Sequence, residues 1–135
     1  MKTEPVFVYG TLRRGASNHF RMAGAEFVGD GTIAGRIHFI DSHPAFVYPA
    51  LVCGGNERVV GELFLVEATK HLAELDRFEG INPRSDEPDE YRRIKVEVKM
   101  DSGESRLAWV WDWAGDLGDS RALEGGDWMA FSKDF

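Results

Sequence analysis

Apolar and β-branched residues occur in short runs between glycine-rich or polar stretches, a pattern typical of a chain built mainly from strands. Residues 6–9, Val-Phe-Val-Tyr, are apolar on both faces and predict a central buried strand that ends at Gly10. Further strands are expected at residues 26–29, 32–40, 46–52 and 59–66, with turns at Gly29-Asp30-Gly31 and Gly54-Gly55-Asn56.

Two segments have helical character. A short helical piece is expected within residues 17–25. The main helix is expected from Thr69, as its N-cap, to Phe78 or Glu79, with Gly80 as the stop signal. Only one substantial helix is therefore predicted.

A second hairpin is expected near the carboxyl end. It follows a polar segment, residues 81–90, which contains two prolines and predicts a loop. Apolar and charged residues alternate over 94–100, and residues 101–103 form the turn. The second arm places four apolar side chains on one face: Leu107, Trp109, Trp111 and Trp113. Trp128 and Phe131 in the tail are available to dock onto the body.

These elements predict an α+β fold, a mixed sheet or small β-barrel with one main helix packed on it. Neither repeats nor a linker divide the chain, so residues 1–135 are expected to form one domain, with a core at about 6–113 and a tail at 114–135. A doubly wound fold would need helices alternating with strands.

Composition narrows the classes of function. Sixteen Lys and Arg against 23 Asp and Glu give a net charge of −7, which disfavours binding to nucleic acid or to an anionic membrane. Cys53 is the only cysteine, so neither an internal disulfide nor a cysteine-based zinc site is possible. No apolar stretch approaches the roughly 20 residues of a membrane span. We therefore expect a cytoplasmic protein, monomeric or weakly homo-oligomeric.

The end of the first strand is the first candidate site. A buried strand that leaves through Gly10 into the tight turn of residues 11–15 presents successive main-chain amides at the end of the sheet. Such a nest suits a carboxylate, a phosphate or a developing oxyanion. The alternative is a plain connection between a strand and a loop.

Glu79 is the second candidate. Leu72 and Leu75 mark the apolar stripe of the main helix, and Glu79 occupies the next position on it. Burial and the helix dipole would both raise its pKa, which is the direction a general acid/base at neutral pH requires. The alternative is a glutamate at a helix end that turns into solvent.

Tyr91 opens the strand after the polar loop and is out of phase with the apolar set of that strand. Its phenol could line a pocket shared with Glu79, or it could be a surface tyrosine. Arg92 and Arg93 are interpreted as salt-bridge partners of the acidic loop. The four histidines show no metal-ligand spacing, and Cys53 lacks a recognisable base, so no metal, cofactor or thiol nucleophile is expected.

Three motifs in order resemble the γ-glutamylcyclotransferase-like (AIG2-like) family. They are Tyr9-Gly10-Thr11-Leu12, Val60-Gly61-Glu62-Leu63-Phe64, and Leu75-Asp76-Arg77-Phe78-Glu79-Gly80 followed by Tyr91-Arg92-Arg93. The resemblance implies a compact mixed β-barrel, a γ-glutamyl group bound by Tyr9, Gly10, Thr11 and Leu12, catalysis by Glu79, and a pocket lined by Tyr91. Residues 81–90 are longer than in short relatives and could fold over the pocket as a lid.

The reaction implied is closure of a γ-glutamyl amide to 5-oxoproline with release of an amine. The substrate's own α-amino group is the nucleophile, so the protein needs neither a reactive serine nor a reactive cysteine. The alternatives are a domain that binds γ-glutamyl compounds without turnover, and a hydrolase or acyltransferase acting on the same small molecules. The leaving amine is not specified by the sequence.

Overall fold

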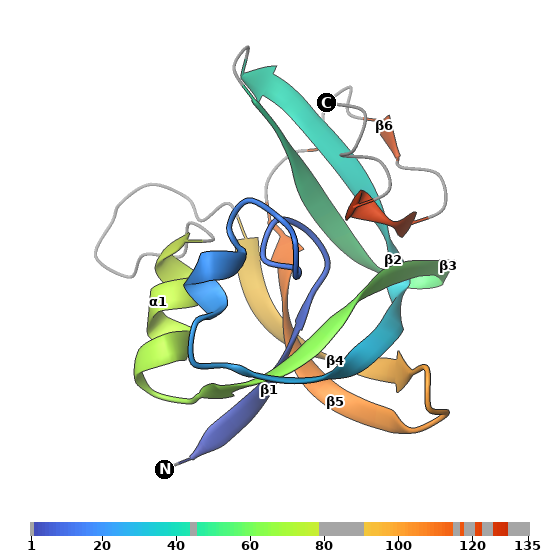
Figure 1. Ribbon diagram of the computed structural model, residues 1–135. Coiled ribbons are helices and arrows are strands. Elements are labelled where there is room, and N and C mark those ends of the chain that lie inside the picture. Colours follow the sequence, from blue (N-terminus) through green and yellow to red (C-terminus); the bar gives the residue numbers. More distant parts are fainter. Residues whose placement is uncertain are drawn as a thin grey trace.

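The computed structural model describes residues 2–43, 46–78, 91–114, 117, 121–122 and 126–129, with the backbone alone for 40–43, 46–48 and 121–122. The chain forms β1 (Thr3–Val8), a 3-10 turn η1 (His19–Met22), β2 (Glu26–His43), β3 (Phe46–Glu67), α1 (Lys70–Phe78), β4 (Tyr91–Met100), β5 (Ser105–Trp113) and β6 (Arg121–Ala122) (Figure 1). Among the described residues, no helix combines the length and apolar character needed to cross a bilayer.

Five strands close into a barrel. The sheet order is β3-β1-β5-β4-β2-β6. An additional pairing of β2 with β3 joins the first and fifth strands of this order, and β6 adds to β2 outside the closed ring. The pairing of β1 with β5 is parallel and the other pairings are antiparallel. The α1 helix packs on the outside of the barrel beside η1 (Figure 1). The predicted fold class, a small mixed β-barrel with one main helix, is therefore confirmed.

The turn predicted within β2 is wrong, because that strand is continuous, whereas the turn predicted within β3 coincides with an interruption of its pairing. Gly29-Asp30-Gly31 stays extended and pairs with residues 61–63 after a bulge at Phe27/Gly29. The absence of a side chain at Gly31 allows β4 to approach closely, since a Cβ there would lie 2.9 Å from the Lys99 carbonyl oxygen. Residues 54–57 form a break in register between two paired stretches of β3, with positive φ at Gly54 and Gly55.

The main helix and the second hairpin agree with prediction, within the described residues. The helix runs over Lys70–Phe78 and the hairpin joins β4 to β5. The short helical piece expected within 17–25 is a single 3-10 turn, His19–Met22. Glu79 and residues 80–90, including the expected stop signal and lid, lie outside the described residues.

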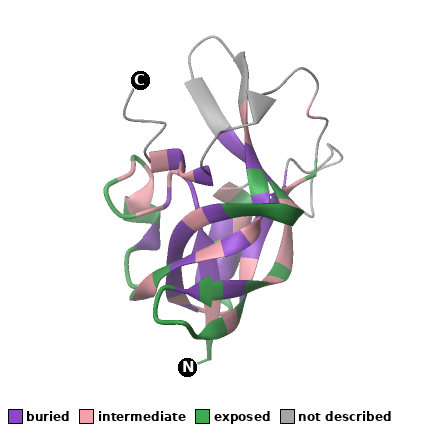
Figure 2. Ribbon diagram, turned by 90° about the vertical axis from the view of Figure 1, so that its right-hand side faces the viewer, coloured by how far each residue is buried: buried purple, intermediate pink, exposed green. Residues whose placement is uncertain are grey.

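Side chains bury into two apolar clusters on opposite faces of the strands. The cluster inside the barrel includes Phe7, Ile33 and Val110, and Trp128 of the tail docks into it as expected. Phe131 lies outside the described residues. The cluster between the barrel and α1 includes Val6, Leu72, Leu75 and Trp111. Buried residues accordingly concentrate along the strands in Figure 2.

Of the four apolar side chains predicted to share one face of β5, the three tryptophans pack into the protein and Leu107 does not. Trp111 is 1% exposed in the α1-facing cluster, and Trp109 and Trp113 pack against it. Leu107 is 62% exposed and belongs to neither cluster, because it lies near the hairpin turn at the start of β5.

Thr69 immediately precedes α1, as expected, and the side chain that accepts the hydrogen bonds at this end of the helix is that of Glu67. The Glu67 carboxylate accepts hydrogen bonds from the Thr69 amide at 3.1 Å, the Thr69 hydroxyl at 2.6 Å and the Lys70 amide at 2.7 Å. The hydroxyl and then the amides lower the Glu67 pKa from 4.5 to about 2. A carboxylate at this end also complements the helix dipole.

We expect this cap to make stability depend on acidity. A carboxyl whose pKa is lowered by folding contributes stability that is complete above its unfolded pKa and is lost as pH falls toward its folded pKa. Urea unfolding of the Glu67→Gln variant should therefore show a smaller loss of stability than wild type between pH 4.5 and about 2. Glu74→Gln, at an exposed position on the same helix, is the matched control. Identical acid profiles for wild type and Glu67→Gln would contradict this account.

Candidate active site

The candidate site begins in the loop that leaves β1. Its turn is closed by the Arg13 amide, which donates to the Gly10 carbonyl at 3.1 Å. The Asn18 amide donates to the Thr11 carbonyl at 2.9 Å, and His19 Nδ1 donates to the Leu12 carbonyl at 2.8 Å. These contacts fix three consecutive carbonyl groups, so the loop has a defined shape.

Two main-chain amides of the same loop are left open. Within the described residues, neither the Thr11 amide nor the Leu12 amide donates a hydrogen bond. Adjacent main-chain amides without partners favour an anion or a developing oxyanion. The side chains of Tyr9 and Leu12 are buried, so the loop presents its main chain rather than these two side chains.

Gly10 and Tyr91 meet at Pro49, on β3. A Cβ on residue 10 would lie 2.7 Å from Pro49 Cγ, so the loop approaches β3 too closely for a larger residue. The Tyr91 hydroxyl donates to the Pro49 carbonyl. The Tyr91 ring packs edge-on against Trp113, with centroids 5.1 Å apart. Tyr91 is thus a buried residue that holds β3 against the loop, and not a surface tyrosine.

Tyr9 connects the loop to β5. Its hydroxyl donates to the Trp111 carbonyl at 2.8 Å within the protein interior. The Trp111 indole Nε1 in turn donates to Asp76 Oδ1 on α1 at 2.9 Å. Trp111 therefore ties the residue before Gly10 to the helix whose last residue, Phe78, precedes Glu79 in the chain.

The described residues bring Tyr9, Gly10, Thr11, Leu12 and Tyr91 together, while Glu79 lies outside them. Its neighbour Phe78 packs against the same apolar cluster that contains Leu12 and Tyr91. The end of α1 and the loop after β1 therefore share one cluster.

Each of the two arginines after Tyr91 has an acidic partner among the described residues. Arg92 Nη2 lies 2.8 Å from Asp112 Oδ2, and Arg93 Nε lies 3.3 Å from Asp76 Oδ1. The acidic loop, residues 81–90, lies outside the described residues, and so does the expected pairing with it. Arg93 helps to anchor α1 to β4.

The only cysteine is unsuited to nucleophilic catalysis. Burial, and then the neighbouring Asp112 carboxylate, raise the Cys53 pKa to about 12. The thiol therefore stays protonated at neutral pH. In the part of the chain that the structure describes, no three His, Cys, Asp or Glu side chains gather as a metal site requires.

Sequence reasoning missed the carboxylates that hold the loop. Glu62 on β3 is 4% exposed and accepts the Arg14 amide at 2.8 Å, and Arg13 Nη1 pairs with Asp127 Oδ1 at 2.7 Å. The signal for Glu62 was present, because it is a lone carboxylate within the otherwise apolar run of residues 59–66.

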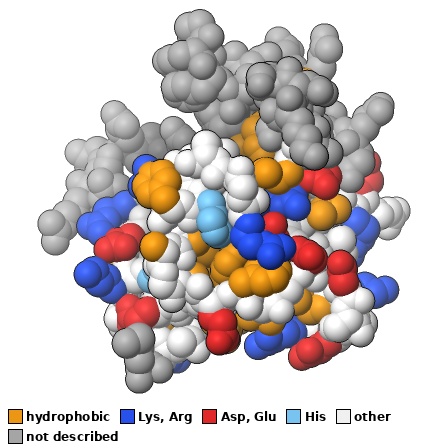
Figure 3. Space-filling view, viewed as in Figure 1, with side chains coloured by type: hydrophobic (Ala, Val, Ile, Leu, Met, Phe, Trp, Pro, Cys, Tyr) orange, Lys and Arg blue, Asp and Glu red, His pale blue; other side chains and the backbone are white. Residues whose placement is uncertain are grey.

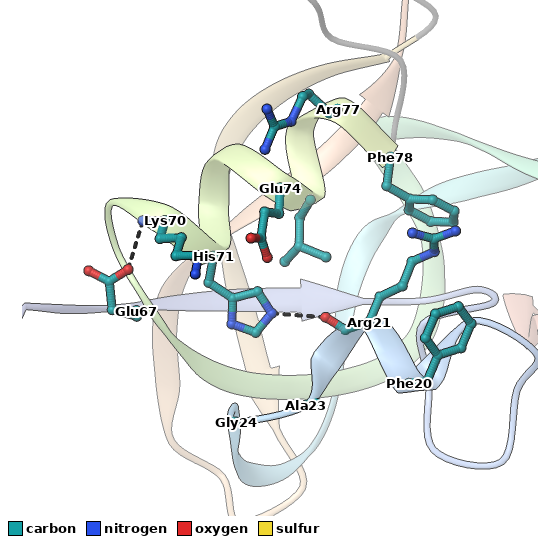
Figure 4. A pocket seen from close by; sticks show the side chains of 11 residues that line it. Phe20, Arg21, Ala23, Gly24, Glu67, Lys70, His71, Glu74, Arg77 and Phe78 are labelled. Carbon is teal, nitrogen blue, oxygen red and sulfur yellow. Dashed lines mark hydrogen bonds between the residues drawn. The ribbon is translucent and has the colours of Figure 1, made fainter.

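A shallow groove of about 850 Å³ lies between η1 and α1 (Figure 4). The Arg21 guanidinium lies 4.3 Å from the Phe78 ring centroid, and His71 Nε2 donates to the Arg21 carbonyl at 2.9 Å. None of residues 9–14 lines this groove. On the face shown in Figure 3, acidic and basic side chains are interspersed.

Comparison with known proteins identifies the family. The family described as gamma-glutamyl cyclotransferase, AIG2-like, matches residues 6–130. The chain is 30% identical to the gamma-glutamylcyclotransferase family protein YtfP of Escherichia coli K12 over 128 residues, 95% of this chain and 98% of that one. It is 34% identical to the gamma-glutamylaminecyclotransferase of Bos taurus over 105 residues, 72% of this chain and 57% of the bovine one.

A solved structure supports the same assignment. An AIG2-like protein from Mus musculus is 28% identical, with a TM-score of 0.70 over 88% of this chain and 82% of the mouse chain. Because the family match extends over most of its length and the fold agrees, this chain belongs to the AIG2-like gamma-glutamyl cyclotransferase family.

Proposed function

We propose that the protein is a γ-glutamylcyclotransferase that converts a small γ-glutamyl amide to 5-oxoproline and releases an amine. The observation that carries this proposal is the pair of open amides at Thr11 and Leu12, in a chain that belongs to this family. Two such donors suit the charges of this substrate, which has an α-carboxylate and develops an oxyanion at its γ-carbonyl.

The chemistry is intramolecular. The α-amino nitrogen attacks the γ-carbonyl carbon and forms the new C–N bond of a five-membered ring. The bond from that carbon to the leaving nitrogen then breaks, and the proton lost by the α-amino group ends on the released amine. The enzyme must hold the chain folded back, move this proton and stabilise the oxyanion.

We assign proton transfer to Glu79, because one carboxylate can accept the proton from the nucleophile and return it to the leaving group. The amides of Thr11 and Leu12 are assigned to the α-carboxylate or the oxyanion. Gly10 allows the loop to approach Pro49, and Tyr91 fixes Pro49 through its hydroxyl. No thiol is required, which agrees with the raised pKa of Cys53.

A panel of γ-glutamyl amides tests the reaction. It should include a γ-glutamyl amino acid, a γ-glutamyl alkylamine and ε-(γ-glutamyl)lysine, with both products measured by mass spectrometry. We expect 5-oxoproline and free amine in equal amounts from at least one member. Free glutamate would instead indicate hydrolysis, and saturable binding without any product would indicate a binding domain.

A further inference from the structure

Glu62 is a buried carboxylate within a barrel strand. In the register of the sheet it lies opposite Val8 of β1 on one side and Asp30 of β2 on the other. Burying a carboxylate is costly unless charges and donors compensate it, and an apolar residue would fill a strand position more cheaply. The barrel itself therefore gives no reason for a glutamate at this position.

Within the described residues, every hydrogen-bond and ion-pair partner of the Glu62 side chain belongs to the loop after β1. Oε1 accepts the Arg14 amide at 2.8 Å and lies 3.5 Å from Arg14 Nε. Oε2 lies 3.4 Å from Arg13 Nε. Because the Arg13 amide also closes the turn onto the Gly10 carbonyl, the carboxylate holds the far end of the turn that contains Thr11 and Leu12.

Both arginines are fixed by further contacts. Arg13 Nη1 pairs with Asp127, which lies beside the docked Trp128. The Arg14 guanidinium lies 3.6 Å from the Phe27 ring centroid and 3.4 Å from Asp30 Oδ1. Arg14 thus neutralises two carboxylates that face each other across β2 and β3. The loop is therefore held to two strands, β2 and β3, and to the carboxyl-terminal segment.

We propose that Glu62 is a positioning residue that holds residues 10–14 in the conformation that leaves the Thr11 and Leu12 amides open. The expected effect of Glu62 on catalysis rests on the proposed function, whereas its expected effect on the loop does not. Glu62 acts through the Arg14 amide and the two guanidinium groups, because its oxygens are occupied by them. Preorganised donors need such support, since a displacement of about 1 Å can cost roughly 10²-fold in rate.

The Glu62→Gln variant tests the proposal. Glutamine keeps the size of the side chain but turns an amide donor toward a guanidinium. We expect kcat/KM on the best γ-glutamyl amide to fall at least tenfold, with the pH profile unchanged in position. Loss of one limb of that profile would instead make Glu62 the acid/base and overturn the proposal. Glu57→Gln is the matched control, because Glu57 forms an exposed ion pair with Arg36 on β2.

A second readout does not depend on turnover. In ¹⁵N NMR, the amides of residues 10–14 should have the relaxation of rigid backbone in wild type and of mobile backbone in Glu62→Gln. If wild type converts no γ-glutamyl amide, the proposed function fails while this readout still tests Glu62. A folded Glu62→Gln variant with rigid loop amides and wild-type kcat/KM would overturn the proposal.

Asp127→Asn provides the test should Glu62→Gln fail to fold. Asp127 is partly exposed, lies outside the barrel strands and pairs with Arg13 Nη1, so its replacement changes no strand residue. We expect increased motion of residues 10–14 and a smaller reduction of kcat/KM in the same direction. Unchanged ¹⁵N relaxation of residues 10–14 in this variant would contradict the proposal that these ion pairs hold the loop.

Discussion

Glu79→Gln is expected to lower turnover of the best γ-glutamyl amide by about 10²–10⁴-fold, the usual contribution of general acid–base catalysis. Glutamine has nearly the same shape as glutamate but cannot take the proton from the α-amino group or return it to the leaving amine. Substrate binding should persist, because the groups assigned to it are the amides of Thr11 and Leu12. The measurement is kcat and KM for both proteins, with dissociation constants from calorimetry.

The matched control is Glu74→Gln, which replaces an exposed glutamate on α1 and should keep wild-type turnover. Both variants remove one negative charge, and the two positions are five residues apart in the chain, so a comparison of their rates isolates the role of position 79. A Glu79→Gln enzyme with undiminished kcat would remove the carboxylate from the mechanism. Loss of binding together with turnover would assign Glu79 to substrate recognition instead.

Local pattern was sufficient to predict the elements with strong periodicity. The run at residues 6–9 predicted the central strand, the alternation after Tyr91 predicted the hairpin, and Leu72 and Leu75 predicted the buried side of α1. Gly54 and Gly55 do interrupt the pairing of β3 with β2, with positive φ and open space around them. The turn expected at Gly29–Gly31 was wrong, because glycine permits both a turn and a close approach of strands. Only the tertiary pairing with β3 and β4 separates these two uses.

The candidate site, too, could be predicted only in part from local sequence. The loop at Gly10 was recognisable from its own residues, because a buried strand that ends in glycine exposes main-chain amides. The pairings that support this loop were not recognisable, although Glu62 itself stood out as a lone carboxylate in an apolar run. Arg14 and Glu62 are 48 positions apart, and Arg13 and Asp127 are 114 apart. Pairings of that separation are set by barrel closure and docking of the tail, and no local spacing encodes them.

Trp111 connects the two halves of the proposed site. Its carbonyl accepts the Tyr9 hydroxyl, and its indole donates to Asp76 on α1. A single β5 residue therefore relates the strand that leads into the open amides to the helix that leads to Glu79. This geometry explains why Asp76 belongs to the motif of residues 75–80: it secures the helix, while the assigned chemistry resides three residues later.

We expect Trp111→Ala to lower the free energy of unfolding by about 3–5 kcal/mol, the range for removing a large buried aromatic side chain. Trp111 is 1% exposed and lies among Val6, Leu72 and Leu75, so the deletion leaves a cavity beneath α1. Trp111→Phe should cost less, about 1–3 kcal/mol, chiefly because Asp76 loses the indole donor. Urea denaturation of the three proteins measures both differences.

Leu107→Ala is the control on the same strand, because Leu107 is 62% exposed and should change stability by less than about 0.5 kcal/mol. If Trp111 couples α1 to the loop, Trp111→Phe should also reduce kcat/KM under conditions where it remains folded, whereas Leu107→Ala should not. Equal stabilities for Trp111→Ala and Leu107→Ala would show that α1 is held without the indole. A stable, fully active Trp111→Phe enzyme would show that Trp111 contributes only by packing.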